Sequence, residues 1–186
     1  MRRLRRGGRS QGDSLGRSAV PPGSRAAPTF AALDLGTNNC RLLVAEPAAG
    51  GPAGFRVVDG YSQIVRLGEG LSASGRLSDA AMARTMGALA ECLAKIERHQ
   101  PIDVGCIATQ ACRAATNGGD FLARVEAELG LRFRVIEPAD EARLAVLGCA
   151  ALLDPEAEAA LVVDIGGGST ELSWVEPARA QAGCLD

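Results

Sequence analysis

The sequence predicts an α/β fold in which helices pack on a mixed sheet. Between residues 29 and 154 the hydrophobic pattern runs strand, strand, strand, helix, strand, helix, strand, helix. A strand–turn–strand pattern near the start, built around Asp34, recurs around Asp164, which indicates a duplicated lobe. We therefore expect a ribonuclease-H-like first lobe followed by the first hairpin of a second lobe.

The first half of this lobe is expected to hold three antiparallel strands and a long helix. The strand segments are TFAALDLG, NNCRLLVAEP and FRVVDGYSQIVRLGEGL, in which apolar and β-branched residues recur. Ser78 is a suitable N-cap for the helix that follows. Its apolar residues recur at helical spacing: Met82, Met86, Leu89, Leu93 and Ile96.

The second half alternates short strands with helices. IDVGCIAT is apolar throughout, as expected of a buried strand, and a helical turn follows around QACRAAT. Asp120 is expected to cap the helix FLARVEAEL, and Gly130 to end it. LRFRVIE alternates like a strand, and a last helix is expected after Pro138.

Charge separates the N-terminal tail from the rest of the chain. Residues 1–28 carry seven arginines against the single acid Asp13, and their Gly-, Ser- and Pro-rich composition predicts disorder. The formal net charge of the whole chain is -2, so no overall basic field favours nucleic acid. We expect a disordered tail at 1–28, a first lobe at 29–154 and an incomplete second lobe at 155–186.

The cysteines and the hydropathy pattern predict a cytoplasmic protein. The six cysteines form no CxxC pair, so they read as small buried side chains rather than a zinc site or a disulfide framework. No apolar run reaches the roughly 20 residues that span a bilayer. The sequence thus predicts neither a membrane nor a specific nucleic acid as a partner.

The two Gly-rich hairpins carry the chemistry. Each places an Asp at the end of an apolar strand and follows it with glycine and small polar residues, in DLGTNNCRLLV and DIGGGSTELSWV. Backbone N–H groups in such turns surround phosphate oxygens. A carboxylate beside phosphate requires a cation, so Asp34, Asp164 and Glu171 are candidate ligands of Mg²⁺.

Five motifs in order, DLGTNNCRLL, VRLGEGL, IATQACRAATN, DEARL and DIGGGSTEL, resemble those of the Ppx/GppA phosphatases in the actin-like ATPase superfamily. The similarity covers about residues 30–176. It implies hydrolysis of a terminal phosphoanhydride of inorganic polyphosphate or guanosine pentaphosphate, with Mg²⁺ as cofactor. For full-length members it also allows a homodimer, whereas this sequence leaves the oligomeric state open.

The resemblance implies roles for individual residues. Glu141 in DEARL falls at the family's catalytic carboxylate, which handles the attacking water, and Asp164 is associated with both catalysis and metal. Arg113 falls at an arginine that holds the polyphosphate chain, and Arg66 is a weaker candidate of that kind. The residues expected to bind phosphate in the two turns are Gly36, Thr37, Asn38, Asn39, Gly167, Gly168, Ser169 and Thr170.

Two other classes of function stay open at this stage. The second lobe would hold only its first hairpin before residue 186, so the chain also reads as a fragment that binds phosphate without turnover. A kinase or actin-like ATPase would share both Gly-rich hairpins, although the DEARL segment argues against it. His99 is expected to serve the end of its helix rather than catalysis.

Overall fold

The computed structural model describes residues 27–49 and 54–181, and its larger sheet confirms the predicted mixed α/β fold. The five strands lie in the order β3-β2-β1-β4-β5. β1 pairs antiparallel with β2 and parallel with β4, and β5 is parallel to β4. Their bounds are Phe30–Leu35 (β1), Asn39–Pro47 (β2), Phe55–Ile64 (β3), Asp103–Ala108 (β4) and Arg134–Val135 (β5).

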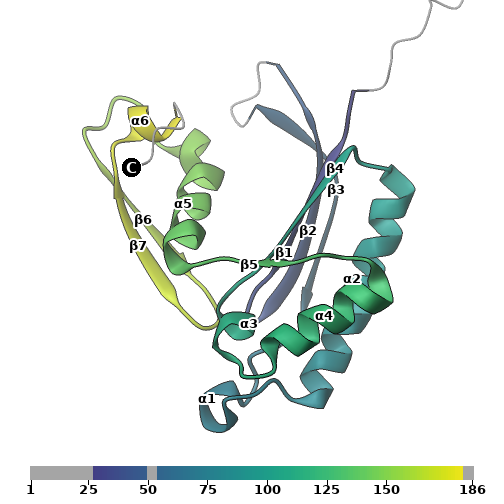
Figure 1. Ribbon diagram of the computed structural model, residues 1–186. Coiled ribbons are helices and arrows are strands. Elements are labelled where there is room, and N and C mark those ends of the chain that lie inside the picture. Colours follow the sequence, from purple (N-terminus) through teal and green to yellow (C-terminus); the bar gives the residue numbers. More distant parts are fainter. Residues whose placement is uncertain (1–26, 50–53, 182–186) are drawn as a thin grey trace, which may run out of the picture.

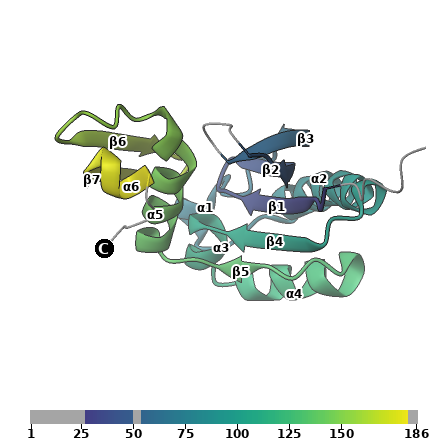
Figure 2. The same ribbon diagram turned by 90° about the horizontal axis from the view of Figure 1, so that it is seen from above.

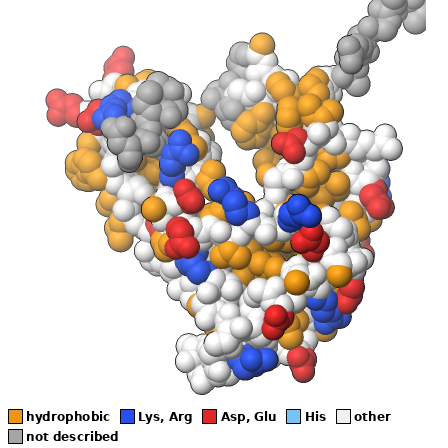
Figure 3. Space-filling view, in the orientation of Figure 1, with side chains coloured by type: hydrophobic (Ala, Val, Ile, Leu, Met, Phe, Trp, Pro, Cys, Tyr) orange, Lys and Arg blue, Asp and Glu red, His pale blue; other side chains and the backbone are white. Residues whose placement is uncertain are grey.

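Two helices cover one face of this sheet, α2 (Asp79–His99) and α4 (Gly118–Leu129) (Figures 1 and 2). Along β1 the side chains alternate, with Leu33 and Leu35 buried in the core and Phe30 and Ala32 exposed. The helices therefore bury one side of the pleat, and the core lies between them and the sheet. In the space-filling view, the opposite side faces a hollow (Figure 3).

The elements from residue 138 onward form a smaller body across that hollow (Figure 1). A two-stranded sheet is made by β6 (Ala160–Ile165) and β7 (Thr170–Val175), which pair antiparallel. Helix α5 (Pro138–Cys149) packs on this hairpin, together with the 3-10 helix η1 (Ala150–Leu152) and α6 (Pro177–Gln181). The sequence analysis assigned the residues of α5 to the first lobe. In the structure, the buried apolar residues of α5 pack against the hairpin instead. The predicted lobe boundary at residue 154 stays a prediction.

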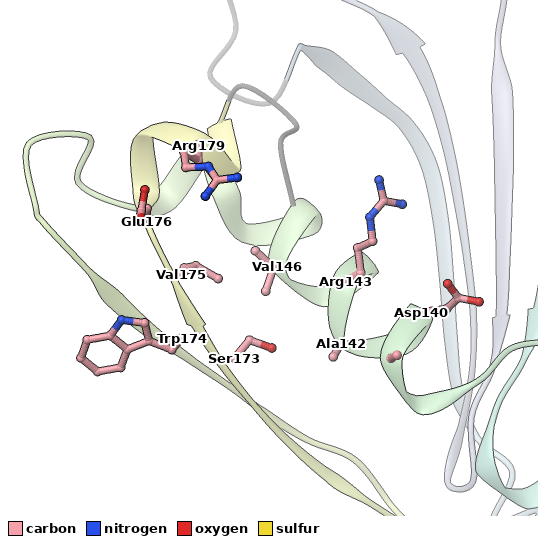
Figure 4. Close-up of a pocket in the computed structure, with 10 residues that line it drawn as sticks. Asp140, Ala142, Arg143, Val146, Ser173, Trp174, Val175, Glu176 and Arg179 are labelled. Atoms are coloured by element: carbon pink, nitrogen blue, oxygen red, sulfur yellow. The ribbon is translucent and has the colours of Figure 1, made fainter. Parts of the chain in front are cut away.

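One small hydrophobic cluster joins α5 to the hairpin. Val146 of α5 and Val175 of β7 are both buried in it, and they face each other in the close-up of Figure 4. The other face of the hairpin is exposed, as shown by Trp174, which retains 76% of its accessible surface and points away from α5. Within the described residues, α5 thus stabilises, together with η1 and α6, a hairpin that would be marginal alone.

The start of α4 differs from the prediction that Asp120 caps it. The helix begins at Gly118 with Asn117 as N-cap, so Asp120 lies in its first turn. A Cβ on Gly118 would lie 2.0 Å from the carbonyl oxygen of Cys112, so this close approach requires glycine. The Asn117 side chain joins Leu77 through hydrogen bonds of 2.8 and 3.0 Å instead of capping the helix.

The other boundaries follow the sequence more closely. The Ser78 hydroxyl accepts a hydrogen bond from the N–H of Ala81 and caps α2, and Gly130 ends α4 with a φ of 69°. The LRFRVIE segment forms only the two-residue strand β5. Two short helices lie between these elements. The sequence did not predict α1 (Leu71–Ser74), which precedes α2, but it did predict α3 (Gln110–Ala114), which follows β4.

An ionic cluster ties strand β3 to helix α2. Both carboxylate oxygens of Asp59 accept hydrogen bonds from Lys95, at 2.9 and 3.0 Å, and Nε2 of His99 lies 2.9 Å from the same group. The N–H of Gly60 donates to it at 2.7 Å. Hydrogen bonds from Lys95, His99 and Gly60 hold the pKa of Asp59 well below its usual range. His99 therefore has a structural role, away from the Gly-rich turns.

Replacing Asp59 with asparagine is expected to lower the urea midpoint of unfolding at pH 7. A depressed pKa stabilises the folded state above the ordinary aspartate value of 3.8, and this contribution is lost as the pH falls toward the folded pKa. The difference between wild type and Asp59→Asn should therefore be full at pH 7 and smaller at pH 3. Glu158→Gln, at an exposed position before β6, is the control; equal midpoints for Asp59→Asn and wild type at pH 7 would contradict the prediction.

Three sequence predictions concern regions or properties that the structure covers in part. No helix among residues 27–49 and 54–181 is long and apolar enough to cross a membrane. The cysteines in this part of the chain are free thiols, and Cys184 lies outside it. Of the tail predicted to be disordered, residues 1–26 also lie outside the described residues.

Candidate active site

The first Gly-rich turn joins β1 to β2 and is held by the chain that follows β3. Within the turn, the N–H of Gly36 donates to the carbonyl of Asn39 at 2.9 Å. The N–H groups of Val65 and Arg66 donate to the carbonyl of Asn38 at 2.8 and 3.0 Å. The VRLGEGL motif thus supports the turn through its backbone, while the Arg66 side chain is exposed.

Glycine is required at one further point of this support. The N–H of Gly68 donates to the carbonyl of Thr37 at 2.9 Å. A Cβ on Gly68 would lie 2.4 Å from Cγ2 of Thr37, so a larger residue would displace the Thr37 side chain. The motif therefore fixes where the Thr37 hydroxyl lies.

The second turn repeats the geometry of the first. The N–H of Gly166 donates to the carbonyl of Ser169 at 3.0 Å, which is the bond that Gly36 makes to Asn39. Asp164 of β6 lies opposite Glu171 of β7, just as Asp34 of β1 lies opposite Arg41 of β2. The two hairpins therefore confirm the predicted repeat of a strand, a Gly-rich turn and a return strand.

The two turns meet each other. A Cβ on Gly167 would lie 2.7 Å from Cβ and 3.1 Å from the backbone nitrogen of Asn38. A Cβ on Gly168 would lie 2.4 Å from Oε1 of Gln110 and 2.8 Å from Oγ1 of Thr37. Glycines at 167 and 168 are therefore what allows the hairpins to approach tip to tip, at the lower end of the hollow between the two bodies (Figures 1 and 3).

Helices α3 and α5 bring an arginine and a glutamate to the same region. Arg113 of α3 donates from Nη1 to the carbonyl of Ile136, and that nitrogen lies 3.9 Å from Oε2 of Glu141. Glu141 lies in the first turn of α5, where the helix dipole favours an anion. Its Oε2 is buried and has no hydrogen-bond partner, which is costly for a carboxylate.

The acidic groups influence one another. Burial raises the pKa of Asp34; the Arg41 guanidinium opposes that shift and the Asp164 carboxylate adds to it. Burial and the Glu171 carboxylate raise the pKa of Glu141, and Asp34 adds a smaller effect of the same sign. Acids from β1, α5, β6 and β7 therefore share one electrostatic environment, which is typical of functional sites.

Two groups favour the ionised form of Glu141 against this trend. The Arg113 guanidinium and a hydrogen bond from the Thr109 hydroxyl both lower its pKa, although the net shift is upward. Thr109 is itself placed by its N–H, which donates to the carbonyl of Leu35 at the end of β1 at 3.1 Å. The glutamate is thus oriented by Thr109 and by Arg113 of α3, while its Oε2 makes no hydrogen bond.

No three His, Cys, Asp or Glu side chains in the described part of the chain lie close enough together to enclose a metal ion by themselves. Mg²⁺ commonly takes only one or two carboxylates and completes its shell with water and phosphate oxygens. The Asp164 carboxylate raises the pKa of Asp34, and these two residues are the pair predicted for such a site. The donor set fits Mg²⁺ bound together with a phosphate ligand rather than in a protein cage.

A cavity of about 500 Å³ is lined by residues of α5, β7 and α6. Its lining includes Asp140, Arg143, Ser173 and Trp174 (Figure 4). Asp140 and Arg143 belong to α5 but point away from Trp174 and β7 in that view. The Gly-rich turns and Glu141 do not line this cavity, so it is separate from the candidate site.

The structure brings together most of the residues that the motifs singled out. Thr37, Asn38, Gly167 and Gly168 meet directly, while Gly36, Asn39 and Ser169 shape the turns through backbone hydrogen bonds. Thr170 begins β7. The role of each of these residues stays a prediction.

The sequence reading overlooked three neighbours of the site: Arg41, Thr109 and Gln110. Arg41 pairs with Asp34 across the first hairpin, and the other two follow β4. The carboxyl end of a parallel strand next to β1 is where ligand-binding residues gather in such sheets. Applied to the segment IATQ at the end of β4, that rule would have indicated Thr109 and Gln110.

Comparison with known proteins agrees with the motifs. The profile of the Ppx/GppA phosphatase family matches residues 43–182. Exopolyphosphatase 2 of Mycobacterium tuberculosis is 38% identical over 148 residues, which cover 76% of this chain and 46% of that protein. The chain thus spans about half the length of the curated relatives it matches.

Solved structures show the same relationship. A Ppx/GppA family member from Aquifex aeolicus is 34% identical with a TM-score of 0.70, over 81% of this chain and 48% of that one. An exopolyphosphatase from Cytophaga hutchinsonii is 27% identical with a TM-score of 0.73, over 78% of this chain and 46% of that one.

Proposed function

Because the chain belongs to the Ppx/GppA phosphatase family, we propose that it forms the phosphate-binding part of a phosphohydrolase that removes the terminal phosphate of inorganic polyphosphate. The observation that carries this proposal is the buried Oε2 of Glu141, which lies beside Arg113 and makes no hydrogen bond. A buried carboxylate oxygen without a partner is suited to accept a proton from a water molecule. The exopolyphosphatase relatives favour polyphosphate over guanosine pentaphosphate as the substrate.

In the proposed reaction, Glu141 accepts a proton from a water molecule whose oxygen attacks the terminal phosphorus. The bond from that phosphorus to the bridging oxygen breaks, and orthophosphate and a chain one unit shorter leave. Arg113 already donates to Ile136, and the rest of its guanidinium fork is suited to hold phosphate oxygens. No covalent intermediate with the protein is needed.

Backbone N–H groups of the two turns are proposed to hold the transferred phosphoryl group, because the glycines at 167 and 168 place no side chain where the turns meet. Of the predicted ligands Asp34, Asp164 and Glu171, the first two would hold Mg²⁺, which would supply positive charge against the phosphate oxygens, and Glu171 would lie beside them on β7. Asp164 would thereby serve catalysis as well as metal binding. We place this reaction in the cytoplasm, a proposal that the free thiols support.

A second candidate is binding of phosphate ligands without turnover. It is favoured by the second sheet, in which the described residues provide only two strands with one face exposed. A site of this kind would keep both Gly-rich turns but hold Glu141 too loosely for efficient proton transfer.

The test is orthophosphate release from long-chain polyphosphate by the purified chain with Mg²⁺ and without ATP. We expect release that stops on addition of EDTA and is slower with guanosine pentaphosphate. Binding of tripolyphosphate without release would favour the second candidate. Phosphate transfer that requires ATP would instead identify a kinase and contradict both.

A further inference from the structure

We propose that Gln110 is a positioning residue that holds the two phosphate-binding turns at a fixed separation. Gln110 is the first residue of α3, directly after Thr109. Its Oε1 accepts a hydrogen bond of 3.0 Å from the hydroxyl of Thr37 in the first turn. This inference rests on the function proposed above and adds a determinant of the geometry of that site.

The same carboxamide reaches the second turn. Only the absence of a side chain at Gly168 allows the contact, since a Cβ there would lie 2.4 Å from Oε1 of Gln110 and 2.8 Å from Oγ1 of Thr37. The Gln110 side chain therefore touches both turns at the point where they meet. A shift of Gln110 would change the distance between the turns.

Gln110 is suited to this role because its helix is anchored at both ends. The N–H of Thr109 donates to Leu35 at the end of β1, and the Arg113 side chain donates to Ile136 after β5. Residues three apart in a helix lie on the same side, so Gln110 and Arg113 point to one region. Helix α3 thus couples the spacing of the turns to the Arg113–Glu141 pair.

The consequence is an effect on rate rather than on folding. Phosphoryl transfer depends on placing the phosphorus against the attacking water, and a misplacement of about 1 Å costs roughly 100-fold in rate. We expect Gln110→Ala to lower kcat about 10- to 100-fold with a smaller change in KM. Its melting temperature should match that of the wild type, because the side chain is only partly buried and outside the core.

The decisive experiment is a double-mutant cycle on phosphate release. Thr37→Val removes the hydroxyl that donates to Gln110 with little change of shape, and the loss in the double variant should be smaller than the product of the two single losses, because both remove the same hydrogen bond. Gln63→Ala, on β3, serves as a control with wild-type kcat. Independent, multiplicative losses in the double variant, or an unchanged kcat in Gln110→Ala, would overturn the proposal.

A second measurement does not depend on activity and separates failure of this inference from failure of the proposed function. The N–H groups of Gly36 and Gly166 are hydrogen-bonded within the two turns, so their exchange with deuterium reports how firmly each turn is held. Gln110→Ala should speed exchange at both, and Gln110→Glu, which keeps an acceptor for Thr37, should restore it. Unchanged exchange in Gln110→Ala would overturn the positioning role even if the wild type released no phosphate.

Discussion

Replacing Glu141 with glutamine is expected to lower the rate of orthophosphate release about 1,000-fold at pH 7, since a general base typically contributes 100- to 10,000-fold. The amide keeps the size of the side chain but takes no proton from water. The measurement is kcat for release from polyphosphate with saturating Mg²⁺. Asp140→Asn, the exposed neighbour in the same helix turn, is the matched control and should retain wild-type kcat.

The stability of the Glu141→Gln variant distinguishes a catalytic from a structural glutamate. Burial and the Glu171 carboxylate raise the pKa of Glu141 above its ordinary value of 4.5, so Glu141 loses its proton less readily in the folded than in the unfolded chain. Ionisation of Glu141 therefore costs stability as the pH rises through that raised pKa, and the cost is absent below the ordinary value. The glutamine variant should be at least as stable as the wild type at pH 7.

A structural role for Glu141 would give the opposite result. If its carboxylate mainly held Arg113, at 3.9 Å, then the amide would loosen α3 against α5 and lower the urea midpoint at pH 7. A destabilised variant with substantial residual activity would therefore contradict the assignment of Glu141 as the base.

Replacing Gly167 with alanine is expected to lower kcat/KM for polyphosphate about 100-fold. The added Cβ would lie 2.7 Å from Cβ and 3.1 Å from the backbone nitrogen of Asn38, so the two turns must move apart. The φ of Gly167 lies outside the left-handed region, so the expected effect comes from this contact and not from backbone strain. Steady-state kinetics and thermal unfolding together measure the outcome.

The control for this prediction is Gly87→Ala in the middle of α2. A Cβ at Gly87 meets nothing within 4 Å, and alanine favours a helix by up to about 1 kcal/mol over glycine. That variant should melt at or above the wild-type temperature with unchanged kcat/KM. Wild-type kcat/KM in Gly167→Ala would show that phosphate binding does not need the turns in contact.

Local features of the site were predictable from the sequence. An apolar strand, an Asp, a Gly-rich turn and a return strand form a hairpin through near-neighbour contacts, and both hairpins occur where the pattern predicted them. Ser78 and Gly130 bound their helices for equally local reasons. By contrast, Asp120 failed as a cap because the position of Gly118 is set by a contact with Cys112, which a pattern of neighbouring residues does not reveal.

The sequence by itself therefore determined the α/β element order, the two hairpins and the residue types available for phosphate chemistry. Only the tertiary structure decided that α5 packs on the second hairpin, that Oε2 of Glu141 is buried 3.9 Å from Arg113 without a hydrogen bond, and that Gln110 touches both turns. The physical reason is separation along the chain. Hairpins and caps depend on residues a few positions apart, whereas Gln110 and Thr37 lie 73 positions apart and meet only when the sheet has formed.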